Sequence, residues 1–475
     1  MPFIGTIWGL SACKKHTSVT LDQSKRTEAD LIKDSVYYYY SLYSLWGDML
    51  DVDLNNNHAF TDAYTSPDDV LIALKNLTPY YPGYGGGIDR FSYLESTDVS
   101  GLQASGEEEV GAGFGVFITI GAVSNSMAYP IVYFVEGGSP AADAGIKRSD
   151  IVLSIEGGDD LGIPVSCNLG NCQITDEPRY QSVLNILLSA MDGSTLRLKT
   201  QDALGTERDI TLVSRSYEID PIVASTVFSY PEKQIGYLAL SSFEDISVQA
   251  PFRNHLNAVF QDFEQAAIGD LILDMRYNTG GYVDAAVYLA NKIINPAGNG
   301  ELMYTYKVNR YLLDHPETVD YIFDDVFFDR NNDLNINTLF VLVTDITASA
   351  AELLINVLKP YMHVVLIAEN EGTFGKPVGF FKQEIMGQTA LWAASFQLIN
   401  SRGEGSYWDG IDANIKGVSD YIFKDFGDPE ETMIQAAIQR ARLGVAQRKS
   451  MMTTNTPVQF KMRVVNEVPF RNMRK

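Results

Sequence analysis

The sequence contains no long apolar run, few basic residues and few cysteines. No stretch approaches the ~18 apolar residues that a membrane-spanning helix needs. Lys and Arg number 36 against 60 Asp and Glu, which gives a formal charge of −24. A surface this acidic repels phosphate backbones, so we expect no nucleic-acid partner. Of the three cysteines, Cys167 and Cys172 have none of the five histidines near them in sequence and therefore lack partners for a metal site.

The rest of the composition is typical of a multidomain globular protein. Hydrophobic residues make up 45% and charged residues 20% of the 475 residues, and roughly 100–200 residues per domain allow two to four domains. Residues 28–50 have a helical pattern, and Ser66 with acidic residues behind it predicts the N-cap of a second helix over 70–77. Short apolar runs separated by glycines predict a β-rich domain over 111–215.

From Ile235 onward, strands alternate with longer helical patterns. Strands over 236–240, 270–274 and 339–344 are separated by helical patterns over 248–267 and 284–293, and a helix is expected over 350–358. This alternation predicts an α/β core whose sheet is largely covered. Residues after about 446 are expected to form a loosely held tail.

The first residues resemble a bacterial lipoprotein signal. The apolar stretch from Phe3 to Leu10 is followed by small residues and Cys13, and in such signals the chain is cut before a cysteine that then carries the lipid. The resemblance implies a protein exported to the cell envelope (periplasm or outer membrane) and anchored through Cys13; an ordinary N-terminus with a chance cysteine is the alternative. In an oxidising envelope, Cys167 and Cys172 could form a local disulfide.

Two strand ends carry candidate catalytic groups. The strand that ends at Thr344 leads through a short turn to Ser349 and directly into a helix. The Ser349 hydroxyl is therefore expected at a helix N-terminus, where free N–H groups and the helix dipole favour an oxyanion; a plain N-cap is the alternative. The strand over 270–274 ends in a turn containing Gly280 and Gly281, and glycines there let backbone amides approach a ligand closely.

A third candidate is Lys376, which lies among glycines and apolar residues shortly after a strand over 364–368. Burial disfavours the charged form of a lysine. A neutral lysine takes the proton of a serine hydroxyl and later returns it to the leaving amine. The alternative is a surface lysine in a turn.

Together these motifs resemble the C-terminal processing peptidases, or tail-specific proteases, over about residues 30–442. The sequence Asn-Thr-Gly-Gly at 278–281 is similar to the family's Asn-Pro-Gly-Gly, Thr-Ala-Ser-Ala-Ala-Glu at 347–352 to its Ser-Ala-Ser-Ala-Ser-Glu, and Gly-Lys at 375–376 to its base motif. The resemblance implies a multi-domain α/β fold with a tether (1–27), an N-terminal helical domain (28–107), a β-rich PDZ domain (108–216), a crotonase/ClpP-like serine peptidase core (217–445) and a tail (446–475).

The resemblance also implies the roles of single residues. Ser349 is expected to be the nucleophile and Lys376 the base, with the N–H groups of Ala350 and of Gly281 or Gly280 as the oxyanion hole. No metal and no organic cofactor is implied. Phe380 stands where these peptidases usually place a glutamine that orients the lysine, so no third catalytic residue is assigned.

Residues 111–116 and 139–152 resemble a PDZ domain, with Ser149 in place of the usual glycine. A PDZ domain binds an extended peptide as an added strand and holds its carboxylate with backbone N–H groups. The resemblance assigns that loop to Gly113, Phe114 and Gly115. A glycine-rich hairpin without a ligand is the alternative.

The predicted function is therefore that of a serine endopeptidase that cleaves unfolded or C-terminally exposed polypeptides. Its partner is a polypeptide, and it meets a membrane only through a lipid at Cys13. The rival hypothesis is a peptide-binding or scaffolding lipoprotein of the same fold with weak or no catalysis. Phe380 favours the rival, whereas the presence of both Ser349 and Lys376 disfavours it.

Overall fold

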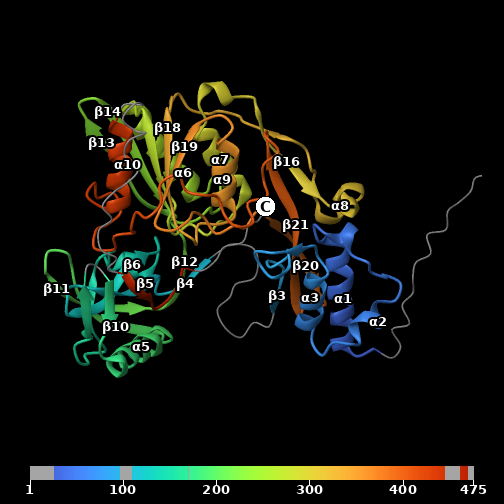
Figure 1. The fold of residues 1–475 in the computed structure, drawn as a ribbon, viewed down its shortest axis with the longest axis horizontal. Helices are drawn as coiled ribbons and strands as arrows, with labels where there is room; N and C mark the ends of the chain where they lie inside the picture. The colour runs from blue at the N-terminus through green and yellow to red at the C-terminus, as the bar shows by residue number, and fades with distance from the viewer. Residues whose placement is uncertain (1–25, 97–109, 169–170, 444–460, 469–475) are drawn as a thin grey trace, which may run out of the picture.

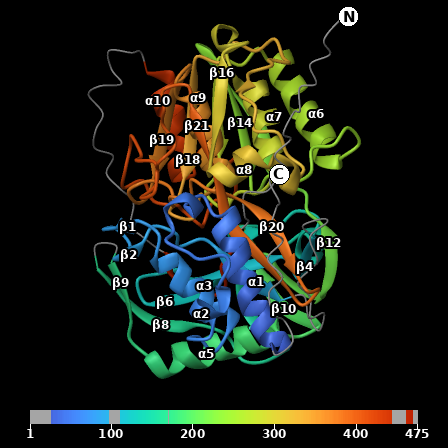
Figure 2. The ribbon, with the colours of Figure 1, turned by 90° about the vertical axis from the view of Figure 1, so that its right-hand side faces the viewer.

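The computed structural model describes residues 26–96, 110–168, 171–443 and 461–468 (Figure 1). Figures 1 and 2 show an α/β core, a β-rich domain below it, and N-terminal helices beside both. No helix within these ranges is long and apolar enough to cross a membrane. Cys13 lies outside the described residues.

The α/β core is built on a five-stranded sheet in the order β13-β14-β15-β18-β19. β13 pairs antiparallel with β14, and β14, β15, β18 and β19 run parallel. Every residue of β15 and β18 is buried, as expected for parallel strands covered on both faces. The strands are β13 (Ile222–Tyr230), β14 (Lys233–Leu240), β15 (Asp270–Asp274), β18 (Thr338–Val343) and β19 (His363–Ala368).

Helices cover both faces of this sheet because its side chains alternate. Leu271 and Leu273 pack in one cluster with residues of α6 (Pro251–Gln265), α7 (Val283–Ile293) and α9 (Ala350–Leu358). Ile272, between them, packs in another cluster with α10 (Thr432–Arg442). The expected α/β core is confirmed.

A second sheet extends from the core to the N-terminal helices and was not predicted. It contains β16 (Leu302–Val308), β17 (Val326–Phe327), β20 (Gly379–Ile385), β21 (Thr389–Asn400) and β3 (Tyr93–Ser96). Residues of α1 (Glu28–Tyr43) and α3 (Pro67–Asn76) pack in one cluster with side chains of β20 and β21. The ribbon in Figure 2 shows α1 next to β20. Ser66 caps α3 as expected, because its side chain accepts the Asp69 N–H at 3.1 Å. The shorter elements here are α2 (Asn57–Thr61), α8 (Arg310–Asp314), β1 (Tyr80–Tyr81) and β2 (Gly86–Gly87).

The β-rich domain contains a sheet in the order β11-β10-β7-β6-β5-β22. Cys167 and Cys172 form a disulfide between the paired strands β8 and β9. The elements are β4 (Val110–Gly113), β5 (Val116–Ala122), β6 (Met127–Val135), β7 (Ile151–Ile155), β8 (Ile163–Asn168), β9 (Asn171–Ile174), β10 (Thr195–Gln201), β11 (Glu207–Val213), β12 (Arg215–Glu218), α4 (Pro140–Asp143) and α5 (Glu177–Met191).

The expected loose tail is wrong for residues 461–468. β22 (Lys461–Val464) pairs antiparallel with β5, far away in sequence. The physical reason is that β5 is otherwise the edge of its sheet, with a row of unpaired N–H and C=O groups. Sequence periodicity in a four-residue strand is too short to reveal such a pairing.

A buried ionic network joins the β-rich domain to the core. Arg276 contacts Asp274 at 2.7 Å, Asp420 at 2.7 Å and Glu431 at 3.0 Å, and Arg148 of the β-rich domain reaches the same Asp420 at 2.5 Å. Burial raises the pKa of Glu431, and the charge of Arg276 opposes that rise. The network is strongly coupled, because Asp420 is shared by two arginines.

Replacing Asp420 by Asn should therefore destabilise the protein by about 3–5 kcal/mol, since two buried guanidinium groups lose their common counter-charge. The midpoint of urea unfolding measures the loss. Asp314→Asn is the matched control, because Asp314 pairs with Arg310 on the surface and should cost less than about 1 kcal/mol. Equal midpoints for the two variants would contradict a structural role for the network.

Candidate active site

Ser349 lies at the turn between β18 and α9, immediately before the first residue of the helix. The residue is fully buried, at 0% exposure, and its Oγ has no hydrogen-bond partner among the residues that the structure describes. Its backbone has φ 63° and ψ −120°, a left-handed conformation that favours glycine. Ser349 occupies the N-cap position of α9, but its unpaired Oγ does not satisfy a helix N–H, so a plain N-cap role does not account for the hydroxyl.

Glu352, on the first turn of α9, accepts four hydrogen bonds through its carboxylate. Its Oε2 accepts the N–H of Ser349 at 2.9 Å and the N–H of Lys376 at 2.8 Å. Its Oε1 accepts the hydroxyl of Thr373 at 2.6 Å and the N–H of Gly375 at 2.7 Å. Burial raises the pKa of Glu352 above its usual value, and these four hydrogen bonds oppose that rise without cancelling it. The carboxylate thus holds the loop of residues 373–376, here called the lysine loop, against the turn of residues 344–349, here called the serine turn.

Lys376 follows β19 through a tight loop and is buried at 4% exposure, which rules out the surface alternative. Gly375 has φ 94°, and a Cβ there would lie 2.4 Å from the Trp408 carbonyl oxygen, so this position requires glycine. The Lys376 Nζ lies 4.8 Å from the centre of the Phe380 ring. An aromatic face stabilises an ammonium group, and Phe380 therefore supports the charged form of the lysine.

The two candidate catalytic residues are neighbours because they share one acceptor atom. The Ser349 and Lys376 N–H groups both bond to Glu352 Oε2, so the two nitrogens are separated by no more than the sum of those two hydrogen bonds. A further hydrogen bond of 2.9 Å, from the Phe374 N–H to the Thr347 carbonyl, fixes the loop to the turn.

The glycine turn after β15 lies against the same serine turn. The Ala348 N–H donates to the Asn278 carbonyl at 3.1 Å. Gly280 has its own N–H bonded to Asn278 Oδ1 at 3.0 Å. In the described part of the chain, the N–H groups of Gly281 and Ala350 donate to no protein acceptor. Of the two glycines predicted for the oxyanion hole, Gly281 is thus the one whose N–H is available to donate to an oxyanion.

The N-terminal region reaches the same loop through Arg90, which sequence reasoning did not assign to the site. Its guanidinium donates to the Gly375 carbonyl at 3.1 Å and lies 4.1 Å from the Tyr84 ring centre and 4.8 Å from that of Phe374. Trp408 stacks beside Phe91 at 6.3 Å between ring centres. None of the sequence motifs described above contains Arg90 or Trp408.

The predicted peptide loop of the β-rich domain lies between β4 and β5. Gly113 has φ 91° and Gly115 φ 67°, and Phe114 is buried at 4% exposure. Among the described residues, the N–H groups of Phe114 and Gly115 donate to no protein acceptor. The loop thus has free donors, as carboxylate binding requires.

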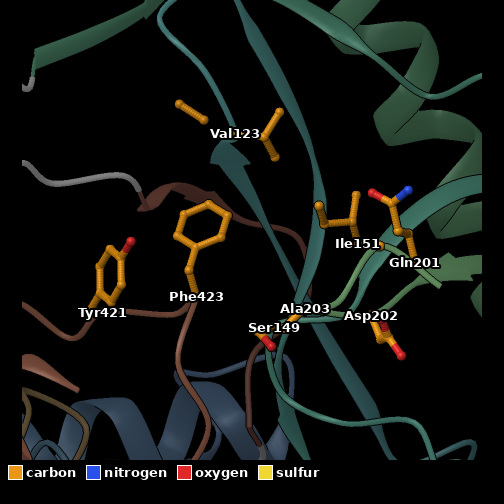
Figure 3. Close-up of a pocket in the computed structure, with 10 residues that line it drawn as sticks. Val123, Ser149, Ile151, Gln201, Asp202, Ala203, Tyr421 and Phe423 are labelled. Atoms are coloured by element: carbon orange, nitrogen blue, oxygen red, sulfur yellow. The ribbon is translucent and has the colours of Figure 1, made fainter. Parts of the chain in front are cut away.

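A pocket of about 410 Å³ lies elsewhere, between the β-rich domain and the segment that follows Asp420. Figure 3 shows Tyr421 and Phe423 on one side of it and Ile151, Gln201 and Asp202 on the other. None of the candidate catalytic residues lines it. Within the described ranges, no group of three or more His, Cys, Asp or Glu is placed to hold a metal ion.

Residues 234–416 match the model of peptidase family S41. The α/β core is thus similar to peptidase family S41, over less than half of the chain. Ser349, Lys376 and the glycine turn all fall within the matched residues.

The curated proteins similar to this chain include processing proteases. It is 30% identical over 241 residues to the carboxyl-terminal-processing protease of Synechocystis sp., covering 50% of this chain and 47% of that one. It is 25% identical over 297 residues to the carboxy-terminal processing protease CtpA of Bacillus subtilis, covering 62% and 55%. The chain thus spans about half the length of the curated relatives it matches.

Among solved structures, the chain is similar to a putative S41 protease from Bacteroides fragilis. The TM-score is 0.62 at 21% identity, over 87% of this chain and 97% of that one. This similarity shows a shared fold that extends beyond the core to most of the chain.

The strained backbone at Ser349 generates a stability prediction. Glycine adopts φ 63° without the steric cost that a Cβ imposes, so Ser349→Gly should be more stable than Ser349→Ala by about 1 kcal/mol. Both variants remove the buried hydroxyl, so the comparison isolates the backbone. Urea unfolding of the two variants measures the difference, and a Gly variant that is no more stable than the Ala variant would contradict the strain.

Proposed function

We propose that this protein is a serine endopeptidase that cleaves unfolded or C-terminally exposed polypeptides with Ser349 and Lys376. The observation that carries the proposal is the shared Glu352 carboxylate, which places a buried serine hydroxyl without a partner beside a buried lysine. A residue with no catalytic role has no reason to keep a strained backbone and an unsatisfied hydroxyl together.

In the proposed mechanism, Ser349 Oγ attacks the scissile carbonyl carbon while its proton passes to the neutral Lys376 Nζ. The N–H groups of Gly281 and Ala350 donate to the oxyanion that forms. Lys376 then gives the proton to the leaving amine, and the C–N bond breaks to leave an acyl-serine. Water, deprotonated by Lys376, hydrolyses this ester and returns the serine hydroxyl.

We propose that the β-rich domain is a PDZ domain that binds the C-terminal end of the substrate at Gly113, Phe114 and Gly115. The positive φ of the two glycines and the free N–H groups of Phe114 and Gly115 support this. In this binding mode the peptide adds as a strand to the sheet edge.

We also place the protein in the cell envelope, with a lipid on Cys13. The Cys167–Cys172 disulfide supports this location, since disulfides persist in oxidising compartments. The lipoprotein-like residues around Cys13 are its second support.

A second candidate function is peptide binding without catalysis. The observation that favours it is the position of the Lys376 Nζ over the Phe380 ring. The ring stabilises the protonated lysine, whereas a general base must be neutral before it can accept a proton. The activity of the purified protein distinguishes the two.

The deciding experiment is cleavage of a reduced, unfolded model protein. The wild type should cleave it, Ser349→Ala should be inactive, and Lys376→Ala should lose at least roughly 100-fold, the range of a general base. Lys382→Ala, a lysine on the neighbouring strand that pairs with Glu384, is the control and should stay active. An inert wild type would support peptide binding alone, and activity that survives Lys376→Ala would mean that another group is the base.

Glu352→Gln should lower kcat about 100-fold with little change in KM, because an amide NH₂ would face an N–H donor and displace either the serine turn or the lysine loop. Steady-state kinetics on a chromogenic peptide measures both constants. Glu371→Gln is the matched control, since Glu371 pairs with Lys416 on the surface. Full activity of Glu352→Gln would show that the Glu352 carboxylate does not position Ser349 and Lys376.

A further inference from the structure

The outer edge of β5 is occupied by the chain's own residues 461–468. In the antiparallel register Lys461 opposes Gly121 and Val464 opposes Thr119. The ladder continues past the strand, because the Val465 N–H donates to the Ile118 carbonyl at 2.9 Å. The tail therefore satisfies backbone groups that an edge strand leaves open.

The side chain of Asn466 bonds to the backbone of β5 as the backbone of a paired strand would. Asn466 Oδ1 accepts the N–H of Ile118 at 2.7 Å, and its Nδ2 donates to the Val116 carbonyl at 3.0 Å. The Asn466 carbonyl accepts the Tyr133 hydroxyl at 2.9 Å. These bonds depend on the identity of residue 466, so the tail is recognised by sequence and not only as a generic strand.

Two valines anchor the tail on opposite faces of β5. Val465 packs against the hydrophobic core that α5 helps to form. Val468, at 4% exposure, packs in a separate cluster with Phe117 and Tyr133. Glu467, between them, is exposed. Apolar side chains of the tail thus fill sites on both faces of the receiving strand, as those of a bound peptide do.

The tail also runs in the direction proposed for a substrate. As its residue numbers rise, its partners on β5 fall from Gly121 to Val116, toward the loop of Gly113 to Gly115. A peptide whose carboxylate binds that loop has its C-terminal end on the same side. The tail and such a peptide need the same backbone groups of β5.

We propose that residues 461–468 are the resident ligand of the β5 edge, and that a substrate's C-terminal segment binds there only by displacing them. The inference rests on the proposed function in one respect, that β5 is where substrate peptides bind. The pocket of Figure 3 lies at the end of β5 that pairs with the first residue of β22, since Ala122 and Val123 line it. A longer displacing peptide extends past Gly121 toward this pocket.

The first test measures peptide binding in a Ser349→Ala background, so that nothing is cleaved and the result does not depend on catalysis. The probe is a fluorescent synthetic peptide with the sequence of residues 458–470, followed by anisotropy. Val468→Asp places a charge among buried rings and should release the tail, so the probe should bind this variant at least tenfold more tightly than the parent. Glu467→Gln is the control and should bind like the parent.

Equal affinity for the parent and the Val468→Asp variant would overturn the proposal, as would a folded Val468→Asp variant that does not bind the probe. Thermal unfolding of each variant shows whether it is folded.

The second test locks the tail in place with a cross-link instead of releasing it. Thr119→Cys with Val464→Cys creates a facing pair, which should oxidise within one chain. The oxidised protein should not bind the probe, and thiol reduction should restore the binding. The single variant Thr119→Cys, treated in the same way, controls for reduction of Cys167–Cys172. Undiminished binding to the locked protein, no cross-link, or a cross-link between two copies would each overturn occupancy within the chain.

Discussion

The arrangement of the site depends on one buried carboxylate, that of Glu352. Burial alone penalises its charge, yet both oxygens accept two donors each. The Thr373 hydroxyl also accepts the Ile411 N–H at 2.7 Å, so its proton is committed to Glu352. If Glu352 were protonated, its own O–H would point at one of these four donors. The four hydrogen bonds therefore fit the ionised carboxylate. The serine turn and the lysine loop are therefore joined through this one carboxylate.

Around this centre, the chain builds the site from segments that are far apart in sequence. The glycine turn after β15, the serine turn after β18 and the lysine loop after β19 meet because parallel strands end at the same edge of a sheet. Arg90 adds a contact from the N-terminal region, and the shared Asp420 fixes the β-rich domain to the core. Tyr277, which donates to Asp420, directly precedes the glycine turn. The position of the β-rich domain and that of the turn are thus set by one network.

What the sequence predicted was local. The strand over 270–274, the helix over 350–358 and the cap at Ser66 depend on residues adjacent in sequence, and all three are confirmed. Contacts across the fold left no such signal. The second sheet joins residues 93–96 to 389–392, and β22 joins residues separated by most of the chain. The role of Glu352 needed the loop of Lys376 beside it, because a glutamate on the first turn of a helix is by itself only a favourable charge.

The same chain covers both places where a polypeptide is proposed to bind. Ser349 and Lys376 are buried, and the β5 edge is paired with β22. A segment tethered in the same chain meets its edge at a high effective concentration, so a free peptide competes well only if it is abundant or makes contacts that the tail lacks. The pocket beside Ala122 offers such contacts to a longer peptide. Selectivity for long, exposed chain ends would then follow from competition, without any residue of the catalytic pair having to read the substrate.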